Sequence, residues 1–478
     1  NSYNKIKTDS DLNKIDISLI VIKGFIELYD KDVVSLSQNI NLGVEGIFIQ
    51  QNDKYAIFPP QIAIQENWDE IQMLQNLCFR NNFSMNCWKN NSTKLYKYEP
   101  ISFISRQNKI INVYRTIPLI EQSSITKNKI YDSVIEAANW QLRMQKSDGS
   151  YEYYFNPSNG YYSQEDNLIR QALAAYSMAR LYGFTKNDEY LLSAEKNIDF
   201  ILTYMNKDND IAYLTFDDAS NLGMVAVMLL AILELPDYTK YKREIDLFSN
   251  FLLFMQREDG SFKTYYNSNQ PDDFDFYPGE TMLALVRLYK KTNEKRYLDA
   301  VEKAFPFYRN YFSKIKHTPF VMWQISTFSE MYEITKNREY ADFVFAMADW
   351  IVNQQYDEKN ALYPDFLGGF KDKSSVPTVS SAVYIEGIAD AYQTAKIIND
   401  RERIKKYGKS LKLASRFILQ LQFDEINSYN IQNPENVIGA IKESLISNNL
   451  RIDYTAHSIF ALLKIYKVYD ELGLYYHS

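Results

Sequence analysis

The segment IYDSVIEAANWQL at residues 130–142 is the first copy of a pattern that decides the fold of this chain. A tyrosine stands at the start of a helical segment, and apolar residues follow at the spacing of one helix face. Five further copies follow: EYLLSAEKNIDFI (189–201), KYKREIDLFSNFL (240–252), RYLDAVEKAFPFY (296–308), EYADFVFAMADWI (339–351) and KYGKSLKLASRFI (406–418). Internal repetition indicates an architecture in which each unit buries its apolar face against its neighbours.

Each interval between these tyrosine helices has room for a second helix. The intervening segments include LGMVAVMLLAIL (222–233) and HSIFALLKIY (457–466), which are apolar almost all round. A helix of that kind is typically buried, whereas a helix with one charged face lies at the surface. We therefore expect a mainly α fold. Six helix pairs would close an (α/α)6 toroid over residues 129–478, with the tyrosine helices outside.

The loops alternate in length along the repeats. A long connection follows each tyrosine helix, and a short one follows each second helix, so all the long loops are expected at one end of the ring. Long loops on a rigid scaffold commonly carry function. The inner helices would begin at this end, and the positive ends of their dipoles would favour acidic groups and anionic ligands there.

Composition excludes several classes of function. The chain has 478 residues, of which 46% are hydrophobic and 24% charged, as in a soluble globular protein. A net charge of −7 without a basic cluster argues against nucleic-acid binding. The longest apolar run, residues 222–235, is shorter than the ~20 residues that a membrane span needs. Two cysteines, Cys78 and Cys87, do not make a disulfide framework, and we expect a cytoplasmic protein.

Residues 1–104 lack the repeat and are expected to form a small N-terminal α/β domain. Strand signals dominate in KIDISLIVI, GIFIQQ, YAIFPP and KLYKYEPISFI, and one helix is expected from about Trp68 to Arg80. A polar connector, residues 105–128, would lead to the toroid.

The run from Gly43 to Trp88 resembles the AMMECR-type domain family. Matching features, in order, are Gly43 and Gly46, the Phe-Pro-Pro-Gln turn at residues 58–61, Trp68-Asp69 at a helix start, Cys78 and Trp88. The resemblance covers the second half of the family domain. The family's Leu-Arg-Gly-Cys-Ile-Gly signature would lie upstream of it, so the resemblance implies a fold more than an activity.

The repeats from about residue 128 to 478 are similar to two groups of sugar enzymes with toroidal folds. These are the N-acylglucosamine 2-epimerase-like and the unsaturated glucuronyl hydrolase-like groups. The resemblance rests on the repeat form, on Gln-x-x-Asp-Gly-Ser turns at Gln145 and Gln256, and on Tyr-Pro-Gly-Glu at Tyr277. Cyclases also use helix-pair toroids, but their metal and acid motifs are not evident. We expect neither a metal nor a cofactor.

Polar residues near the starts of the inner helices are the candidate site. We expect Asp218, Glu280, Glu386, Asp453 and His457 to be catalytic. Asp217 and Asp218 could instead cap helices, as Asp does well. A carboxylate within the apolar segment around Glu386 has to be paired or functional. Candidate substrate-binding residues are Asp166, Arg170, Tyr277, Trp323, Gln324, Tyr384 and Arg451. Loop aromatics expected to stack on sugar faces are Tyr153, Tyr154, Trp323 and Tyr363.

The strongest cluster is RIDYTAH, residues 451–457. Asp453 and His457 are four residues apart and share a helix face, so the carboxylate could orient the imidazole for proton transfer. The pair could equally be a structural histidine with its partner. His317 falls at the start of the fourth inner helix, as an epimerase that uses two histidines would require.

The leading functional hypothesis is a carbohydrate-active enzyme that acts on a glycan or a uronic-acid-like sugar by carboxylate acid/base catalysis. One alternative is a sugar epimerase that uses His317 and His457. A different class of alternative is a non-catalytic module that binds a ligand or partner within a larger assembly.

Overall fold

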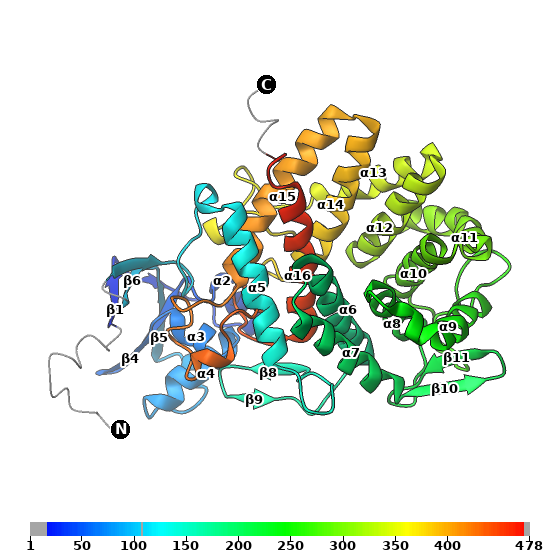
Figure 1. Ribbon diagram of the computed structural model, residues 1–478. Helices are drawn as coiled ribbons and strands as arrows, with labels where there is room; N and C mark the ends of the chain where they lie inside the picture. Colours follow the sequence, from blue (N-terminus) through cyan, green and yellow to red (C-terminus); the bar gives the residue numbers. More distant parts are fainter. Residues whose placement is uncertain (1–16, 107–108, 473–478) are drawn as a thin grey trace.

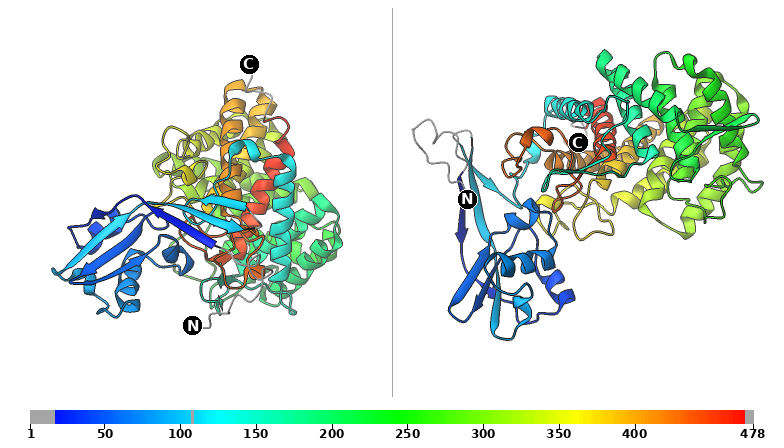
Figure 2. Two further views of the ribbon diagram at one scale, coloured as in Figure 1. Left: turned by 90° about the vertical axis from the view of Figure 1, so that its left-hand side faces the viewer. Right: turned by 90° about the horizontal axis from the view of Figure 1, so that it is seen from below.

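The structure is a computed structural model that describes residues 17–106 and 109–472 (Figure 1). A strand-rich N-terminal domain lies beside a ring of helices. It sits next to the first and last repeats and on the far side from α8–α11, as Figures 1 and 2 both show. Among the described residues, no helix has both the length and the apolar composition that a bilayer span requires.

Six helices form the inner ring. They are α6 (Leu168–Thr185), α8 (Leu222–Glu234), α10 (Tyr277–Thr292), α12 (Thr318–Thr335), α14 (Ser380–Ile398) and α16 (Ile452–Val468). Each packs against the next, and α16 packs against α6, which closes the ring. Nearly every residue of α8 is buried. The predicted (α/α)6 toroid is confirmed.

The six tyrosine helices lie outside this ring, as predicted. They are α5 (Lys127–Arg143), α7 (Asp188–Leu202), α9 (Lys242–Phe254), α11 (Lys295–Lys314), α13 (Arg338–Val352) and α15 (Arg401–Leu421). The first of them, α5, packs against the last inner helix, α16. Tyr131 of α5 is 38% exposed, whereas the other five tyrosines are buried in the apolar stripe: Tyr190, Tyr241, Tyr297, Tyr340 and Tyr407.

Four glutamines join neighbouring outer helices by one recurring contact. The side-chain amide of each donates both to a glycine carbonyl in its own turn and to a carbonyl of the next outer helix. The pairs of acceptors are Gly149 and Ser193 for Gln145, Gly260 and Ala300 for Gln256, Gly368 and Ser410 for Gln355, and Gly439 and Ser133 for Gln422. The last contact reaches back to α5, so it links the end of the repeat array to its beginning.

The turn glycines in these contacts cannot be replaced without strain. Gly439 has φ +92°, and a Cβ there would lie 2.2 Å from the carbonyl oxygen of Glu136 in α5. Gly260 has φ +88° and meets the Lys303 carbonyl at the same 2.2 Å. Glycine is required because the turn both takes a left-handed backbone and lies directly against the neighbouring helix.

The long loops lie at one end of the ring, and those that carry β8 to β11 are at the bottom of Figure 1. Short strands occur within them: β8 (Tyr154–Asn156), β9 (Tyr161–Tyr162), β10 (Met205–Asp208), β11 (Ile211–Leu214) and β12 (Leu450–Arg451). Strand β12 pairs with β8, so the loop before the last inner helix is tied to the first long loop. The inner helices start at this end.

The N-terminal domain contains two antiparallel sheets. The order in one is β2 (Ile26–Glu27), β5 (Thr93–Tyr98), β3 (Gly46–Gln51) and β4 (Lys54–Phe58). The order in the other is β1 (Ile17–Ile22), β6 (Pro100–Arg106) and β7 (Lys109–Val113). Strand β7 lies within the segment that we expected as a connector, because its residues complete the sheet with β6.

Three helices accompany these sheets: α2 (Val33–Asn39), α3 (Gln61–Gln65) and α4 (Glu70–Arg80). Helix α4 begins as expected, with a capping box between Asp69 and Gln72. Cys78 at the end of this helix is disulfide-bonded to Cys87. A single short-range bond is present although the sequence predicted no disulfide framework, because the turn after α4 returns the chain to the same place.

Buried polar contacts hold the two domains together. The Arg115 Nε atom lies 2.7 Å from Asp365 Oδ2, and both side chains are buried. The side-chain amide of Asn67 donates to the side chains of Asn156 and Asn449, at 3.1 and 2.9 Å. Asn67, at φ +53°, ends the turn after α3. The domain is thus attached to the end of the ring that carries the long loops.

Candidate active site

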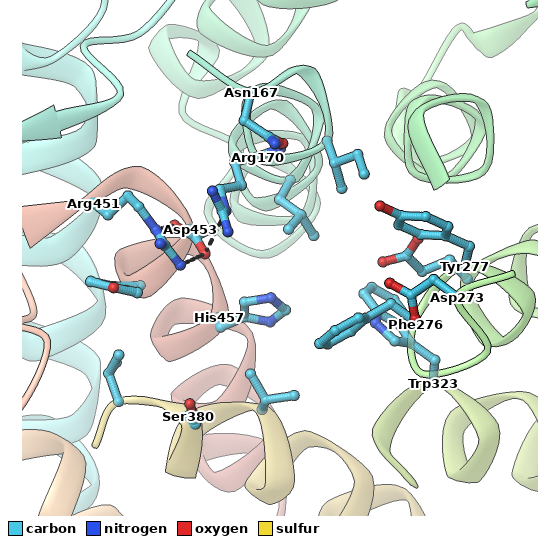
Figure 3. Close-up of a pocket in the computed structure, with 16 residues that line it drawn as sticks. Asn167, Arg170, Asp273, Phe276, Tyr277, Trp323, Ser380, Arg451, Asp453 and His457 are labelled. Carbon is cyan, nitrogen blue, oxygen red and sulfur yellow. Dashed lines mark hydrogen bonds and ion pairs between the residues drawn. The ribbon is translucent and has the colours of Figure 1, made fainter. Parts of the chain in front are cut away.

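A cavity of about 300 Å³ lies where the inner helices begin (Figure 3). Residues from α6, α10, α12, α14 and α16, or from the loops just before them, contribute to its wall. Those with polar or aromatic side chains are Asn167, Arg170, Asp273, Phe276, Tyr277, Glu280, Trp323, Ser380, Arg451, Asp453, Tyr454 and His457. Ring closure is therefore what brings residues nearly 300 positions apart into one site.

One side of the cavity carries two arginines around a carboxylate. Arg451 holds both oxygens of Asp453, with Nε–Oδ1 at 2.6 Å and Nη2–Oδ2 at 2.8 Å. Arg170 Nε lies 3.4 Å from Asp453 Oδ2. Burial pushes the pKa of Asp453 upward, but the guanidinium of Arg451 outweighs it and keeps the pKa below its usual value. Asp453 is therefore an ionised partner of the arginines.

His457 belongs to the same side of the cavity but pairs with a different residue. Its Nδ1 atom lies 2.7 Å from Glu386 Oε1, which comes from α14, and Glu386 is only 4% exposed. The expected Asp453–His457 pair is wrong. Asp453 is turned to Arg451 in the first turn of α16 (Figure 3). Glu386 reaches the imidazole from the neighbouring helix α14.

Glu280 lies in the first turn of α10, on the other side of the cavity. Its side chain is buried, and within the described part of the chain its Oε2 atom has no hydrogen-bond partner. Burial, reinforced by the negative charge of Asp273, raises the pKa of Glu280 to about 8. Gly223 of α8 makes room for it, since a Cβ there would lie 2.7 Å from Oε2 and 2.5 Å from the Tyr277 ring. The carboxyl group is protonated at neutral pH.

Asp273 is a cavity residue that the sequence analysis did not select. Burial raises its pKa, which the nearby charge of Asp275 increases further. Figure 3 shows Asp273, Phe276, Tyr277 and Trp323 opposite Arg170, Arg451 and His457. Its position in the long loop directly before α10 is the sequence feature that could have identified it as a site residue.

Aromatic rings complete the wall. Trp323 approaches His457 edge-on, with ring centroids 6.3 Å apart. Tyr454 lies under the guanidinium of Arg451, whose Cζ is 4.2 Å from the ring centroid. Together with Phe276 and Tyr277, these rings give the cavity apolar faces between its polar groups. Such a mixture is typical of small-molecule sites.

Several predicted residues lie elsewhere. Asp218 does not converge with Glu280 and Asp453, because Asp217 and Asp218 both adopt positive φ in an exposed turn that lies outside the cavity. Neither caps α8, whose cap is Asn221. Asp166 accepts a hydrogen bond from Gln171, and Asn167 caps α6 and lines the cavity in its place.

His317 also lies outside the cavity wall. It precedes α12, and its Nδ1 atom is 2.7 Å from Asp275 Oδ2. Gln324 and Tyr384 are buried within the helix ring, where Tyr384 packs edge-on against Phe370. All three lie at or near the starts of inner helices, but Gln324 and Tyr384 are on helix faces that do not line the cavity, and His317 is held by Asp275.

Most of the loop aromatics are not placed to stack on a sugar in the cavity. Tyr153 forms a hydrogen bond with Arg170, and Tyr154 lies on β8, where it pairs with Arg451 of β12. Tyr363 donates a hydrogen bond to Asn41 of the N-terminal domain at 2.6 Å, so it belongs to the domain interface. Of the four predicted stacking residues, Trp323 alone lines the cavity. Within residues 17–106 and 109–472, no His, Cys, Asp and Glu side chains group as a metal site.

The N-terminal part of the chain matches a known family. Residues 3–103 match the AMMECR1 family model. Curated relatives include a protein of Aquifex aeolicus, 25% identical over 81 residues, and a protein of Pyrococcus furiosus, 25% identical over 88 residues. These alignments cover 15% and 18% of this chain and 42% and 41% of the relatives. The chain thus spans less than half the length of the curated relatives it matches.

The toroid is similar to solved sugar-enzyme structures. A D-mannose isomerase aligns with a TM-score of 0.52 at 14% identity over 72% of this chain and 98% of its own. A sugar epimerase from a ruminal bacterium gives 0.51 at 12% identity over 72% and 99%. An inactive α-1,6-mannanase variant of Salegentibacter, in complex with α-1,6-mannotriose, gives 0.53 at 10% identity over 72% and 100%. At these identities the likeness shows a shared fold.

Proposed function

We propose that the protein is a carbohydrate-processing enzyme whose cavity binds a sugar and transfers protons to and from it, with Glu280 as the acid and His457 as the base. The observation that carries the proposal is the pairing of a protonated buried carboxyl group with an oriented imidazole on the wall of one cavity. Acid and base groups with opposed protonation states are what proton-transfer chemistry at neutral pH requires.

Glu280 has the properties of a general acid. Its pKa of about 8 keeps the proton in place at neutral pH. Its Oε2 atom has no partner within the described residues, so no protein acceptor there competes for the proton. The neighbouring ring of Tyr277 helps to keep the group in an apolar setting.

His457 has the properties of a general base. In the neutral tautomer that donates Nδ1–H to Glu386, Nε2 carries the lone pair and can accept a proton. Since Nδ1 is turned to Glu386, Nε2 is the ring nitrogen left for the cavity. Glu386 thus acts as a positioning residue, although the sequence analysis expected it to be catalytic.

A sugar fits the remaining wall. Trp323, Phe276 and Tyr277 offer apolar faces, while Arg170, Asn167 and Ser380 offer hydrogen-bond donors. The toroids of similar fold include an isomerase and an epimerase of sugars, which supports this substrate class. An epimerase that uses His317 together with His457 is not supported, because His317 is held by Asp275 outside the wall.

Glycoside hydrolysis is the second candidate, and Asp273 is the observation that favours it. Asp273 raises the pKa of Glu280, so the two groups are electrostatically coupled. A protonated Glu280 could protonate a glycosidic oxygen while Asp273 activates water or attacks the sugar. The mannanases of similar fold support this reading of the substrate.

One experiment separates these reactions. Aldoses and ketoses are incubated with the protein in D2O, and deuterium at C2 and new isomers are followed by NMR. Oligosaccharides are assayed in parallel for release of reducing ends. We expect one of the two signals, and its loss in Glu280→Gln. If no sugar is bound or converted, the enzyme proposal fails and the non-catalytic module is favoured.

The N-terminal domain is proposed to be a structural part of this enzyme. That it corresponds to the second half of the AMMECR domain stays a prediction, as do the domain limits at residues 104 and 129. The cytoplasmic location also stays a prediction, and the Cys78–Cys87 bond argues for an oxidising compartment instead.

A further inference from the structure

We infer that the substrate is an oligosaccharide rather than a free monosaccharide, and that it extends from the cavity across Tyr265 into a second hollow between two long loops. This inference rests on the proposed function. It names the length of the ligand and a binding site outside the acid and base already described.

The second hollow has a volume of about 280 Å³. It lies between the loop before α8 and the loop before α10. Tyrosine rings and polar groups line it, principally Tyr213, Thr215, Asp218, Tyr265, Tyr266 and Gln270. Asp218 and Gln270 are exposed, so their carboxylate and amide are free to meet a ligand.

The floor of this hollow is held rigidly. The two loops are joined by backbone hydrogen bonds from Tyr266 to Ser220 and from Leu222 to Thr264, both 2.9 Å. The rings of Tyr213 and Tyr266 pack with centroids 4.6 Å apart, and Tyr266 also packs on Phe251 of α9. A preformed aromatic floor binds a ligand without first having to be ordered.

Tyr265 connects the hollow to the cavity. Its ring contacts the ring of Tyr277 edge-on, with centroids 6.0 Å apart. Tyr277 lines the cavity beside Glu280, so the two spaces share a wall made of two tyrosines. A ligand bound next to Glu280 can therefore continue over this wall.

The chemistry of the hollow matches a sugar ring. Tyrosine presents an apolar face with a polar tip, and a pyranose presents C–H faces with hydroxyls at its rim. Asp218 and Gln270 supply the acceptors and donors for such hydroxyls. Each volume alone is at the lower limit of small-molecule pockets, about 300 Å³. Two adjoining volumes of this size suit a chain of sugar units.

The test compares monosaccharides with trisaccharides by isothermal titration calorimetry on the full chain. The probes are mannose and α-1,6-mannotriose, glucose and maltotriose, and galacturonate and trigalacturonate. We expect at least one trisaccharide to bind at least tenfold more tightly than its monosaccharide. Ser268→Trp, which fills the hollow, should reduce trisaccharide affinity to the monosaccharide level.

Matched controls keep the result specific. Asn269→Trp adds the same ring at the next residue, which does not line the hollow, and should change neither affinity. Asp218→Asn with Gln270→Ala should weaken the trisaccharide alone, and Asn tolerates the positive φ of residue 218. This double variant decides the question if Ser268→Trp does not fold.

The outcomes distinguish the two levels of the proposal. Equal affinities for monosaccharide and trisaccharide, unchanged in both hollow variants, would overturn the oligosaccharide inference and leave the proposed function standing. A complete lack of binding by every sugar would overturn both.

Discussion

The His457 imidazole and the Glu386 carboxylate lie 2.7 Å apart on neighbouring inner helices, and Glu386 is itself almost inaccessible to solvent. A buried carboxylate beside an imidazole can have a structural role and a functional role, and a mutation can separate the two. The structural role needs only a hydrogen bond. The functional role needs the negative charge, which stabilises the imidazolium formed when His457 takes a proton.

The Glu386→Gln variant should therefore retain the fold and lose rate. The amide oxygen can still accept from Nδ1–H, so we expect the melting temperature to change little. Loss of the charge should lower kcat by roughly 10-fold or more, up to the roughly 10⁴-fold loss that follows when the carboxylate behind a catalytic imidazole becomes an amide. Steady-state kinetics on a sugar that the protein converts, with thermal unfolding as the control, measures both. An unchanged kcat would assign the pair a purely structural role.

Replacement of His457 tests the base directly. We expect His457→Asn to abolish turnover while sugar binding persists, because Trp323 and Arg170 remain in the wall. Glu386 then loses a partner, which costs about 1–3 kcal/mol for a buried group. A full loss of stability with normal turnover of the remaining folded protein would contradict the role as base.

Glu280 predicts a pH dependence of both activity and stability. Its pKa is about 8 in the folded protein, above its ordinary value of 4.5. Between pH 4.5 and pH 8, the folded state therefore binds more protons at Glu280 than the unfolded state does. The contribution of Glu280 to the free energy of unfolding is present below pH 4.5 and is lost as the pH rises towards 8. The expected slope is at most about 1.4 kcal/mol per pH unit.

The Glu280→Gln variant is the matched comparison. It should be inactive, and its stability advantage over the parent should grow from pH 5 to 8 and then level off. Chemical denaturation at several pH values measures this difference. In the parent protein, kcat/KM should fall above about pH 8 as the acid loses its proton. A constant difference across pH would contradict the raised pKa.

The sequence predicted the ring better than the site, and the reason is the range of the interactions involved. Helix faces and loop lengths are local properties, so the six repeats and the position of the mouth could be inferred from them. Glu280, Asp453 and His457 were found because each begins an inner helix. Their partners depend on helix rotation and ring closure: Glu386 is 71 residues from His457.

Two incorrect predictions about the site have the same cause. Asp218 precedes an inner helix, but a turn with two positive-φ residues places it in the second hollow. Asp453 and His457 share a helix face, yet both carboxylate oxygens of Asp453 accept hydrogen bonds from Arg451 instead. Sequence spacing indicates which side chains can contact each other. Which of the possible partners a side chain actually binds depends on the tertiary structure.

The interface between the domains should behave as one unit in unfolding. Arg115 and Asp365 are both nearly inaccessible to solvent, so removal of either leaves a buried charge without its partner. We expect Asp365→Asn or Arg115→Met to cost about 3–5 kcal/mol. The double change to Arg115→Met and Asp365→Leu should cost less than either single change. Calorimetry should show one transition in the parent and two in the single variants. Two transitions in the parent would contradict this coupling.

Closure of the ring depends on the contact between the last repeat and the first. Gln422 donates to the carbonyls of Gly439 and Ser133, at 3.0 and 2.9 Å, and Gly439 lies directly against the backbone of α5. Gly439→Ala adds a Cβ 2.2 Å from the Glu136 carbonyl oxygen and strains a positive φ, so we expect a loss of at least about 1–3 kcal/mol.

The control is a glycine that has room. Gly160 also has a positive φ of +69°, but a Cβ there meets nothing within 4 Å. Gly160→Ala therefore measures backbone strain alone, and its difference from Gly439→Ala measures the clash with α5. Gln422→Ala should cost about 1–3 kcal/mol through the unpaired carbonyls. Urea unfolding gives the free energies. Equal losses at Gly160 and Gly439 would show that the ring does not depend on close contact between its two ends.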